Sequence, residues 1–147
     1  MSRTILFLCS GNYYRSRFAQ IYFNYLAARE GLDWRASSRG LATGWEGNVG
    51  PISPHTLAKL ADLRIACDGD VRRLPEQLAE CDLTNAHLVI AVKEDEHRPM
   101  LAEKFPGWQD RVCYWHVHDL NVAPPPAALA EIETLVRELI DQLKRDH

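Results

Sequence analysis

The sequence has no apolar run that approaches the roughly 20 residues needed to cross a bilayer. The apolar stretch near its start, residues 4–8, is too short for a secretion signal, and polar residues follow it at once. No repeat, low-complexity tract or linker interrupts the 147 residues, a length that suits one domain with a hydrophobic core. These absences predict a single cytoplasmic domain over residues 1–147, with no membrane partner.

The sequence also lacks an excess of charge and any cluster of metal-binding side chains. Its net charge is −3 and its pI is near 6.0, so we expect no basic surface for nucleic acid or anionic membrane. The four cysteines are scattered, without a CxxC pair or a Cys/His spacing typical of structural zinc: Cys9, Cys67, Cys81 and Cys113. We therefore expect reduced thiols, no metal, no cofactor and no nucleic-acid partner.

Segments of strand length alternate with longer amphipathic segments along the chain. The strand candidates are residues 4–8, 34–38, 88–92 and 112–117, and helical patterns cover residues 16–29, 55–63 and 96–105. This alternation predicts an α/β fold: a three-layer doubly wound sandwich, with a central four-stranded parallel sheet and helices on both faces.

Local signals define the ends of several of these helices. Gly31 is suited to terminate the first helix, and Ser53 before Pro54 is suited to begin the second. A long last helix follows the proline-rich residues 123–126. It carries one apolar stripe: Leu129, Ile132, Leu135, Val136, Leu139, Ile140 and Leu143.

The stretch CSGNYYRS, which begins at Cys9, joins the first predicted strand to the first helix. Ser10, Gly11 and Asn12 tolerate tight turns, so successive backbone N–H groups can face inward as an anion nest at the helix N-terminus. Arg15 adds the planar, two-pronged donor that suits phosphate oxygens. Because ligands of parallel sheets bind at the carboxyl ends of strands, the stretch predicts a phosphate cradle with a cysteine nucleophile.

A plainer alternative is that Cys9 is only a small core residue at the end of a buried strand. A cysteine six positions before an arginine also occurs often by chance. Three features of the context favour the phosphate site: the position between strand and helix, the Gly-Asn pair inside the loop, and Ser16 directly after the arginine.

The stretch ILFLCSGNYYRSRFAQ resembles the active-site signature of the low-molecular-weight protein tyrosine phosphatase family, in which an apolar strand leads into C-x-G-N-x-x-R-S. The resemblance implies that Cys9 is the nucleophile that takes the phosphoryl group, and that Arg15 binds phosphate and stabilises the transition state. It implies that Asn12 holds the loop in its strained shape. The hydroxyl of Ser16 would hydrogen-bond the thiolate and help it leave when the phosphocysteine is hydrolysed.

A second stretch, SSRGLATGW, resembles the family's next segment, a Ser-x-Gly followed by an aromatic residue. On that match Ser38 supports Asn12 from behind, and Trp45 forms one wall of the pocket mouth. Tyr13 and Tyr14 either add aromatic contacts to an aryl phosphate or only pack against the helix. The predicted substrate- and phosphate-binding residues are Ser10, Gly11, Asn12, Tyr13, Tyr14, Arg15 and Trp45.

Two positions near the loop depart from the family's pattern. Tyr14 stands where many members have a second cysteine, so Cys9 lacks the neighbouring thiol for a protective disulfide. Arg17 stands where the family usually has proline. Arginine is a good helix former, and here it adds positive charge near the pocket.

The expected general acid also departs from the pattern. The family uses an aspartate, usually in Asp-Pro before the last helix, to protonate the leaving oxygen. Asp119 has the right place in the chain, but Leu120 follows it, and a loop aspartate is often just a turn residue. Its position still favours it as the general acid over its weaker neighbours His116 and His118.

The charged residues 94–98 follow the strand candidate 88–92 and so lie at the same edge of the predicted sheet. Their simplest interpretation is a solvated helix start, where acidic side chains suit the helix dipole. The alternative is a rim that docks a partner. A charge run is usually a solvated face, which favours the first.

The resemblance implies a cysteine-dependent phosphomonoester hydrolase, a tyrosine phosphatase that acts through a phosphocysteine. Its substrate would be a phosphorylated protein or a small aryl phosphate, and its product inorganic phosphate. A non-catalytic phosphate- or phosphoprotein-binding domain is the alternative from another class, because the setting of Asp119 is imperfect. Arsenate reduction is less favoured, because thioredoxin-linked reductases need two further cysteines after the middle strand, where KEDEHRPM has none.

Overall fold

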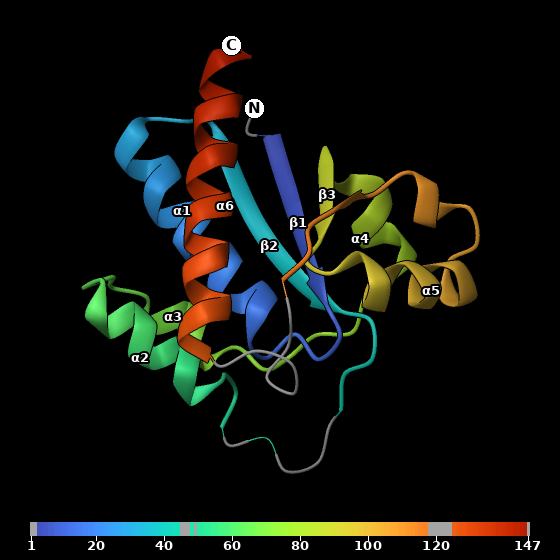
Figure 1. Cartoon of the computed structure of the whole chain (residues 1–147), viewed down its shortest axis with the longest axis horizontal. Helices are drawn as coiled ribbons and strands as arrows, with labels where there is room; N and C mark the ends of the chain where they lie inside the picture. Colours follow the sequence, from blue (N-terminus) through green and yellow to red (C-terminus); the bar gives the residue numbers. More distant parts are fainter. Residues whose placement is uncertain (1–2, 45–47, 49, 118–124, 147) are drawn as a thin grey trace.

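The computed structural model of the chain describes residues 3–44, 48, 50–117 and 125–146. In these residues a parallel sheet of four strands has the order β2-β1-β3-β4 (Figure 1). The strands are β1 (Arg3–Cys9), β2 (Trp34–Gly40), β3 (Leu88–Ala91) and β4 (Cys113–Tyr114). The predicted parallel sheet and doubly wound α/β class are therefore confirmed.

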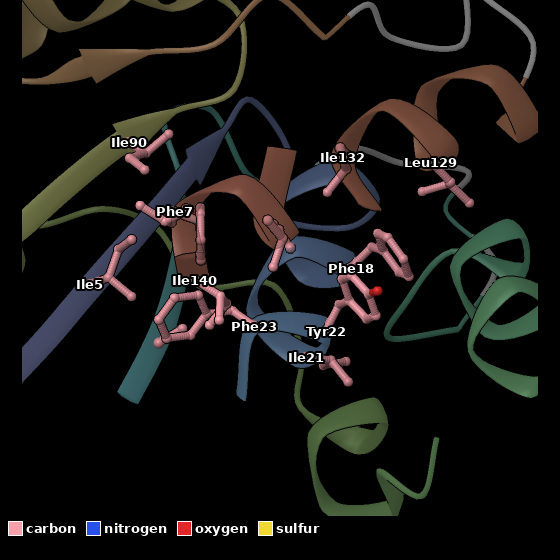
Figure 2. Packing of buried hydrophobic residues seen from close by; sticks show 14 of the residues in the cluster. Ile5, Phe7, Phe18, Ile21, Tyr22, Phe23, Ile90, Leu129, Ile132 and Ile140 are labelled. Carbon is pink, nitrogen blue, oxygen red and sulfur yellow. The ribbon is translucent and has the colours of Figure 1, made fainter. Parts of the chain in front are cut away.

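The central strand β1 is buried on both of its faces. Ile5 and Phe7 belong to one apolar cluster, and Leu6 and Leu8 to the other, because successive side chains of a strand point to opposite sides. Figure 2 shows Ile5 and Phe7 packed toward aromatic and aliphatic residues of the helices on the first face. The unbroken apolar run at residues 4–8 is thus the pattern of a strand covered on both sides.

Helices cover both faces of the sheet, as Figure 1 shows. The first cluster receives buried side chains from α1 (Arg15–Glu30), α2 (Pro54–Asp62) and α6 (Pro125–Arg145). The second receives them from α4 (Glu80–Asn85) and α5 (Glu94–Lys104). Among the described residues no helix combines the length and the apolar character that a membrane span requires.

The predicted helix signals are confirmed. Gly31 adopts the left-handed conformation with φ 68° and its N–H bonds the carbonyls at the end of α1. The Ser53 hydroxyl accepts the N–H of His55 at 3.2 Å and begins α2. The apolar stripe of α6 lies against the core, with Leu135 partly buried and the other six residues buried.

The structure differs from the sequence prediction in the short elements. The ladder of β4 spans two residues rather than residues 112–117, because Lys93 turns away into α5 and meets His116 only in an isolated antiparallel bridge. Helices α3 (Asp68–Arg72) and α4 and the 3-10 turn η1 (Trp108–Asp110) were not predicted. They are too short to show an apolar period in the sequence.

Candidate active site

The loop after β1 lies where the strand order of the sheet reverses. The chain continues from β1 to its neighbour β2 on one side, and reaches β3 on the other side only later. Such a switch point leaves a crevice at the carboxyl ends of the two central strands, which is where ligands of open α/β sheets bind. Cys9 is the last residue of β1 and is 3% exposed.

Asn12 forms the turning point of the loop. Its backbone is left-handed, with φ 51°, and its side chain is fully buried. The Oδ1 atom accepts the backbone N–H of Glu76 at 3.0 Å and Nη1 of Arg73 at 3.1 Å. Both partners can only donate, so the orientation of the Asn12 amide is fixed and its Nδ2 must be a donor.

This orientation determines the hydrogen bond at the cysteine. Asn12 Nδ2 donates to Ser16 Oγ at 2.9 Å, and Ser16 Oγ lies 2.9 Å from Cys9 Sγ. Because the Ser16 oxygen already accepts from the amide, its own proton is directed to the sulfur. A hydroxyl that donates to sulfur stabilises the thiolate, the nucleophilic form of cysteine.

A second layer of side chains supports Asn12 from behind. Its Nδ2 also donates to Ser38 Oγ at 2.9 Å. Ser38 in turn accepts from Arg73 Nη2 at 2.9 Å and donates to Gln20 Oε1 at 2.5 Å. The described geometry places Ser38 where the resemblance implied, and it adds Arg73 and Gln20, which the sequence did not indicate.

Gly40 lets β2 approach the loop closely. A Cβ atom on this residue would lie 2.8 Å from the backbone oxygen of Ser10 and 3.0 Å from Cβ of Asn12. The backbone of Ser10 is also held in place, since its oxygen accepts the N–H of Ala42 at 2.8 Å. A side chain at position 40 therefore has to displace the loop itself.

We expect Gly40→Ala to lower kcat/KM for phosphatase turnover by roughly 10- to 100-fold, because small displacements of catalytic groups cost that much. Steady-state kinetics with p-nitrophenyl phosphate measure this effect. Gly69→Ala is the matched control, since nothing lies within 4 Å of the Cβ that it adds. Equal kcat/KM values for Gly40→Ala and Gly69→Ala would show that the close approach of β2 to the loop at Gly40 does not matter for turnover.

Arg15 begins α1 and is held at both ends of its guanidinium. Its side chain is 2% exposed, Nη1 donates to the carbonyl of Val117 at 2.9 Å, and Nη2 lies 2.9 Å from Oε2 of Glu96. Ser10 is half-buried beside it, and its hydroxyl donates to the same Glu96 oxygen. Residues 94–98 are thus not simply a solvated helix start, because the Glu96 carboxylate contacts Ser10 in the loop after β1 and Arg15 at the start of α1.

Arg17 is buried rather than directed to solvent, with 1% of its surface exposed. Its guanidinium donates to four backbone carbonyls, at distances of 2.7 to 3.3 Å: those of Asn12, Pro51, Asp70 and Arg73. Burial and the charge of Arg73 lower the pKa of Arg17 to about 10, so it stays charged at neutral pH. Burial lowers the pKa of Arg73 in the same direction. The expected positive charge is present, but Arg17 uses it to join segments behind the loop.

The remaining predicted residues have different surroundings. Tyr14 is 5% exposed, its ring meets His55 edge-on with the centroids 6.4 Å apart, and it belongs to the apolar core. Tyr13 is partly buried against the same core, and Gly11 is half-buried in the loop. Trp45 and Asp119 lie outside the described residues, as does His118.

Three functional candidates were missed by sequence reasoning: Glu96, Arg73 and Gln20. Glu96 contacts Arg15 over 81 positions and Arg73 contacts Asn12 over 61, whereas Gln20 acts at one remove, through Ser38, which is 18 positions away. The only sequence signal was that Glu96 follows the strand next to β1. That signal places it at the correct edge of the sheet and says nothing of its contact.

A buried cysteine at the end of a central parallel strand, within hydrogen-bond distance of a serine hydroxyl at the start of the next helix, points to the class of cysteine-dependent phosphatases. The family model for the low molecular weight phosphotyrosine protein phosphatases matches residues 4–147, so the chain belongs to this family. It is a phosphatase that hydrolyses phosphoric monoesters.

Individual relatives agree over nearly the whole chain. A protein-arginine-phosphatase of Bacillus subtilis (strain 168) is 30% identical over 154 residues, which cover 97% of each chain. The crystal structure of a low molecular weight protein tyrosine phosphatase from T. tengcongensis is 25% identical, with a TM-score of 0.79, and the match covers 96% of this chain and 99% of that one. A cysteine-to-serine mutant of YwlE arginine phosphatase, with a phosphorylated active-site serine, is 27% identical with a TM-score of 0.80, and the match covers 98% and 97% of the two chains.

Proposed function

We propose that the chain dephosphorylates proteins through a phosphocysteine intermediate on Cys9. The cysteine sulfur attacks phosphorus in line, the P–S bond forms, and the bond from phosphorus to the leaving oxygen or nitrogen breaks. Arg15 and the backbone N–H groups of the loop hold the equatorial oxygens of the phosphoryl group. Water then attacks phosphorus, the P–S bond breaks, and inorganic phosphate leaves.

One observation carries this proposal: the Ser16 hydroxyl, oriented by Asn12, donates to Cys9 Sγ at 2.9 Å. The same hydrogen bond serves both halves of the reaction. It favours the thiolate as attacking group, and it stabilises the thiolate again as leaving group when the phosphocysteine is hydrolysed. The phosphorylated serine in the mutant relative supports a covalent intermediate at the corresponding position.

Asp119 stays our candidate for the general acid. It would protonate the leaving group in the first half-reaction and take a proton from the attacking water in the second. Its place in the chain supports the assignment, since Val117 at the carboxyl end of the sheet contacts Arg15 through its carbonyl. Trp45 and Tyr13 stay candidates for the pocket wall.

We propose phosphotyrosine in proteins as the first candidate substrate, because this is the substrate that the family's description names. Phosphoarginine is the second candidate, because the relative at 30% identity is a protein-arginine-phosphatase. Tyr14 gives no support for an aryl pocket, since its ring is packed in the core. We further infer one domain over residues 1–147 and a cytoplasmic location, which suits the four cysteines being free thiols.

We expect the chain to hydrolyse p-nitrophenyl phosphate, and to release phosphate from a phosphotyrosine peptide faster than from a phosphoarginine peptide of the same sequence. Phosphate release is measured for all three substrates under identical conditions, with Cys9→Ser as the inactive control. A faster rate on phosphoarginine would reverse the order of the two candidates. If the chain bound phosphate but hydrolysed none of the three substrates, a non-catalytic phosphate-binding domain would describe it better than a phosphatase.

A further inference from the structure

The carboxylate of Glu96 is built into the phosphate loop. Its Oε2 atom lies 2.9 Å from Nη2 of Arg15 and 3.0 Å from Nε2 of His97, and it accepts the hydroxyl of Ser10. Three donors, one each from the loop after β1, from α1 and from α5, thus converge on one oxygen. Only 27% of the Glu96 side chain is exposed, although it stands in the first turn of α5.

His97 fixes the carboxylate from the protein side. The backbone N–H of Lys93 donates to Nδ1 of His97 at 3.1 Å, so the ring proton is on Nε2 and points to Glu96. The imidazole is fully buried and cannot be replaced by solvent. Burial opposes ionisation of Glu96, but the hydrogen bonds from His97, Arg15 and Ser10 outweigh it and hold the pKa of the carboxyl below its usual value.

The contact with Arg15 has a cost for any anion that enters the loop. An incoming phosphoryl group needs the same guanidinium that already binds the Glu96 carboxylate and the carbonyl of Val117. The phosphoryl group must either displace the carboxylate or lie beside a second negative charge. Both alternatives weaken its binding.

We propose that Glu96 competes with phosphate for Arg15, and that this competition limits the affinity of the site for inorganic phosphate, the product of the reaction. Between turnovers Glu96 and the Val117 carbonyl keep Arg15 in place, so that the guanidinium is oriented when a substrate arrives. The competition also prevents free phosphate from filling the site. This inference rests on the proposed function, because it takes the loop to be the phosphate site.

The test compares Glu96→Gln with the unchanged chain by calorimetric titration with inorganic phosphate. Glutamine keeps the size and one acceptor oxygen but removes the charge, so we expect the Kd for phosphate to fall by roughly three- to tenfold. Asp95→Asn is the matched control, because Asp95 is the exposed neighbour in the same helix turn and loses the same unit of charge. We expect the Kd of Asp95→Asn for phosphate to stay within about twofold of the Kd of the unchanged chain, because solvent and salt screen an exposed surface charge.

The thermal stability of Glu96→Gln gives a second readout. A carboxyl whose pKa is lowered by folding contributes stability that is fully present above its unfolded value and is lost as the pH falls through the folded value. At pH 7 the contribution is complete, so the Tm of Glu96→Gln without phosphate should be lower than that of the unchanged chain. Phosphate should then raise the Tm of the variant by more than it raises that of the unchanged chain, because it binds more tightly.

The two measurements separate competition from simple support of Arg15. If Glu96 only positioned the arginine, Glu96→Gln would bind phosphate less tightly or equally, and either result overturns the proposal. Neither measurement uses turnover, so a chain that binds phosphate but hydrolyses nothing would contradict the proposed function alone. A tighter Kd in Glu96→Gln, together with an unchanged Kd in Asp95→Asn, is the result that we expect.

Discussion

Cys9→Ser is expected to lower kcat by about 10⁴-fold or more, the scale seen when a nucleophile is removed from an enzyme. A serine hydroxyl is a much weaker nucleophile than a cysteine sulfur, and the sulfur of Cys9 lies 2.9 Å from the Ser16 hydroxyl. The fold should be retained, because the change replaces one atom in a buried site. Turnover of p-nitrophenyl phosphate measures the loss of kcat, and circular dichroism measures whether the fold is retained.

Inorganic phosphate should still bind to Cys9→Ser, since Arg15 and the loop backbone are unchanged. Any phosphoryl group that does reach the new hydroxyl should stay there, because an alkoxide is a much poorer leaving group than a thiolate. Mass spectrometry after incubation with substrate detects that adduct. Cys81→Ser is the control, an exposed cysteine for which we expect full activity. Activity of Cys9→Ser above about a tenth of the original would contradict the assignment of the nucleophile.

Among these substitutions, Arg17→Met is expected to lower the free energy of unfolding most, by about 3 to 5 kcal/mol. Losses of this size are typical when one partner of a buried charged interaction is removed and the others are left unpaired. The guanidinium donates to four carbonyls, and methionine satisfies none of them. The burial that lowers the pKa of Arg17 already offsets part of the gain from these hydrogen bonds, so the loss is smaller than four times one bond. In a chain of this length the loss corresponds to a fall in Tm of about 10 to 15 °C.

Thermal unfolding followed by circular dichroism measures this loss. Arg72→Met is the matched control, because Arg72 is exposed at the end of α3 and should leave Tm nearly unchanged. Arg17→Lys should lie between the two, since an ammonium group has three donors for four carbonyls. Phosphatase activity of Arg17→Met should also fall at temperatures where it is folded, because Asn12 is one of the four anchored residues. A change in Tm below about 2 °C would show that Arg17 is not the support of the loop.

The fold was predicted best where an apolar pattern can be buried by only one kind of element in one orientation. The run at residues 4–8 could be covered on both faces only as a central strand, and the stripe of α6 could bury its side chains only on one side. The short elements were missed because five or six residues, as in α3 and α4, do not complete enough turns to show a period. The edge strand β4 was predicted too long, since its apolar residues continue after the ladder with β3 has ended.

The candidate site was predicted from one continuous stretch of sequence, residues 9–16, which begins at the cysteine. Cys9, Asn12 and Ser16 lie within seven positions, so the sequence alone brings them close together, whereas the orientation of the Asn12 amide depends on Glu76 and Arg73. Arg17 does bring positive charge close to Cys9, as the sequence predicted, but its side chain also donates to carbonyls 34 to 56 positions away, which the sequence did not indicate. Which side of the helix start it faces depends on segments that the local sequence does not contain.

The sequence by itself therefore determined the class of fold and placed the proposed nucleophile and its loop at the carboxyl end of the central strand, because these depend on short-range order and on the burial of apolar runs. Only the tertiary structure decided what surrounds the loop: Glu96 on Arg15, and Arg73 and Ser38 behind Asn12. The physical reason is that a hydrogen bond requires two groups within about 3 Å in a defined direction. Residues from separate segments reach that geometry only when the whole sheet and its helices are packed.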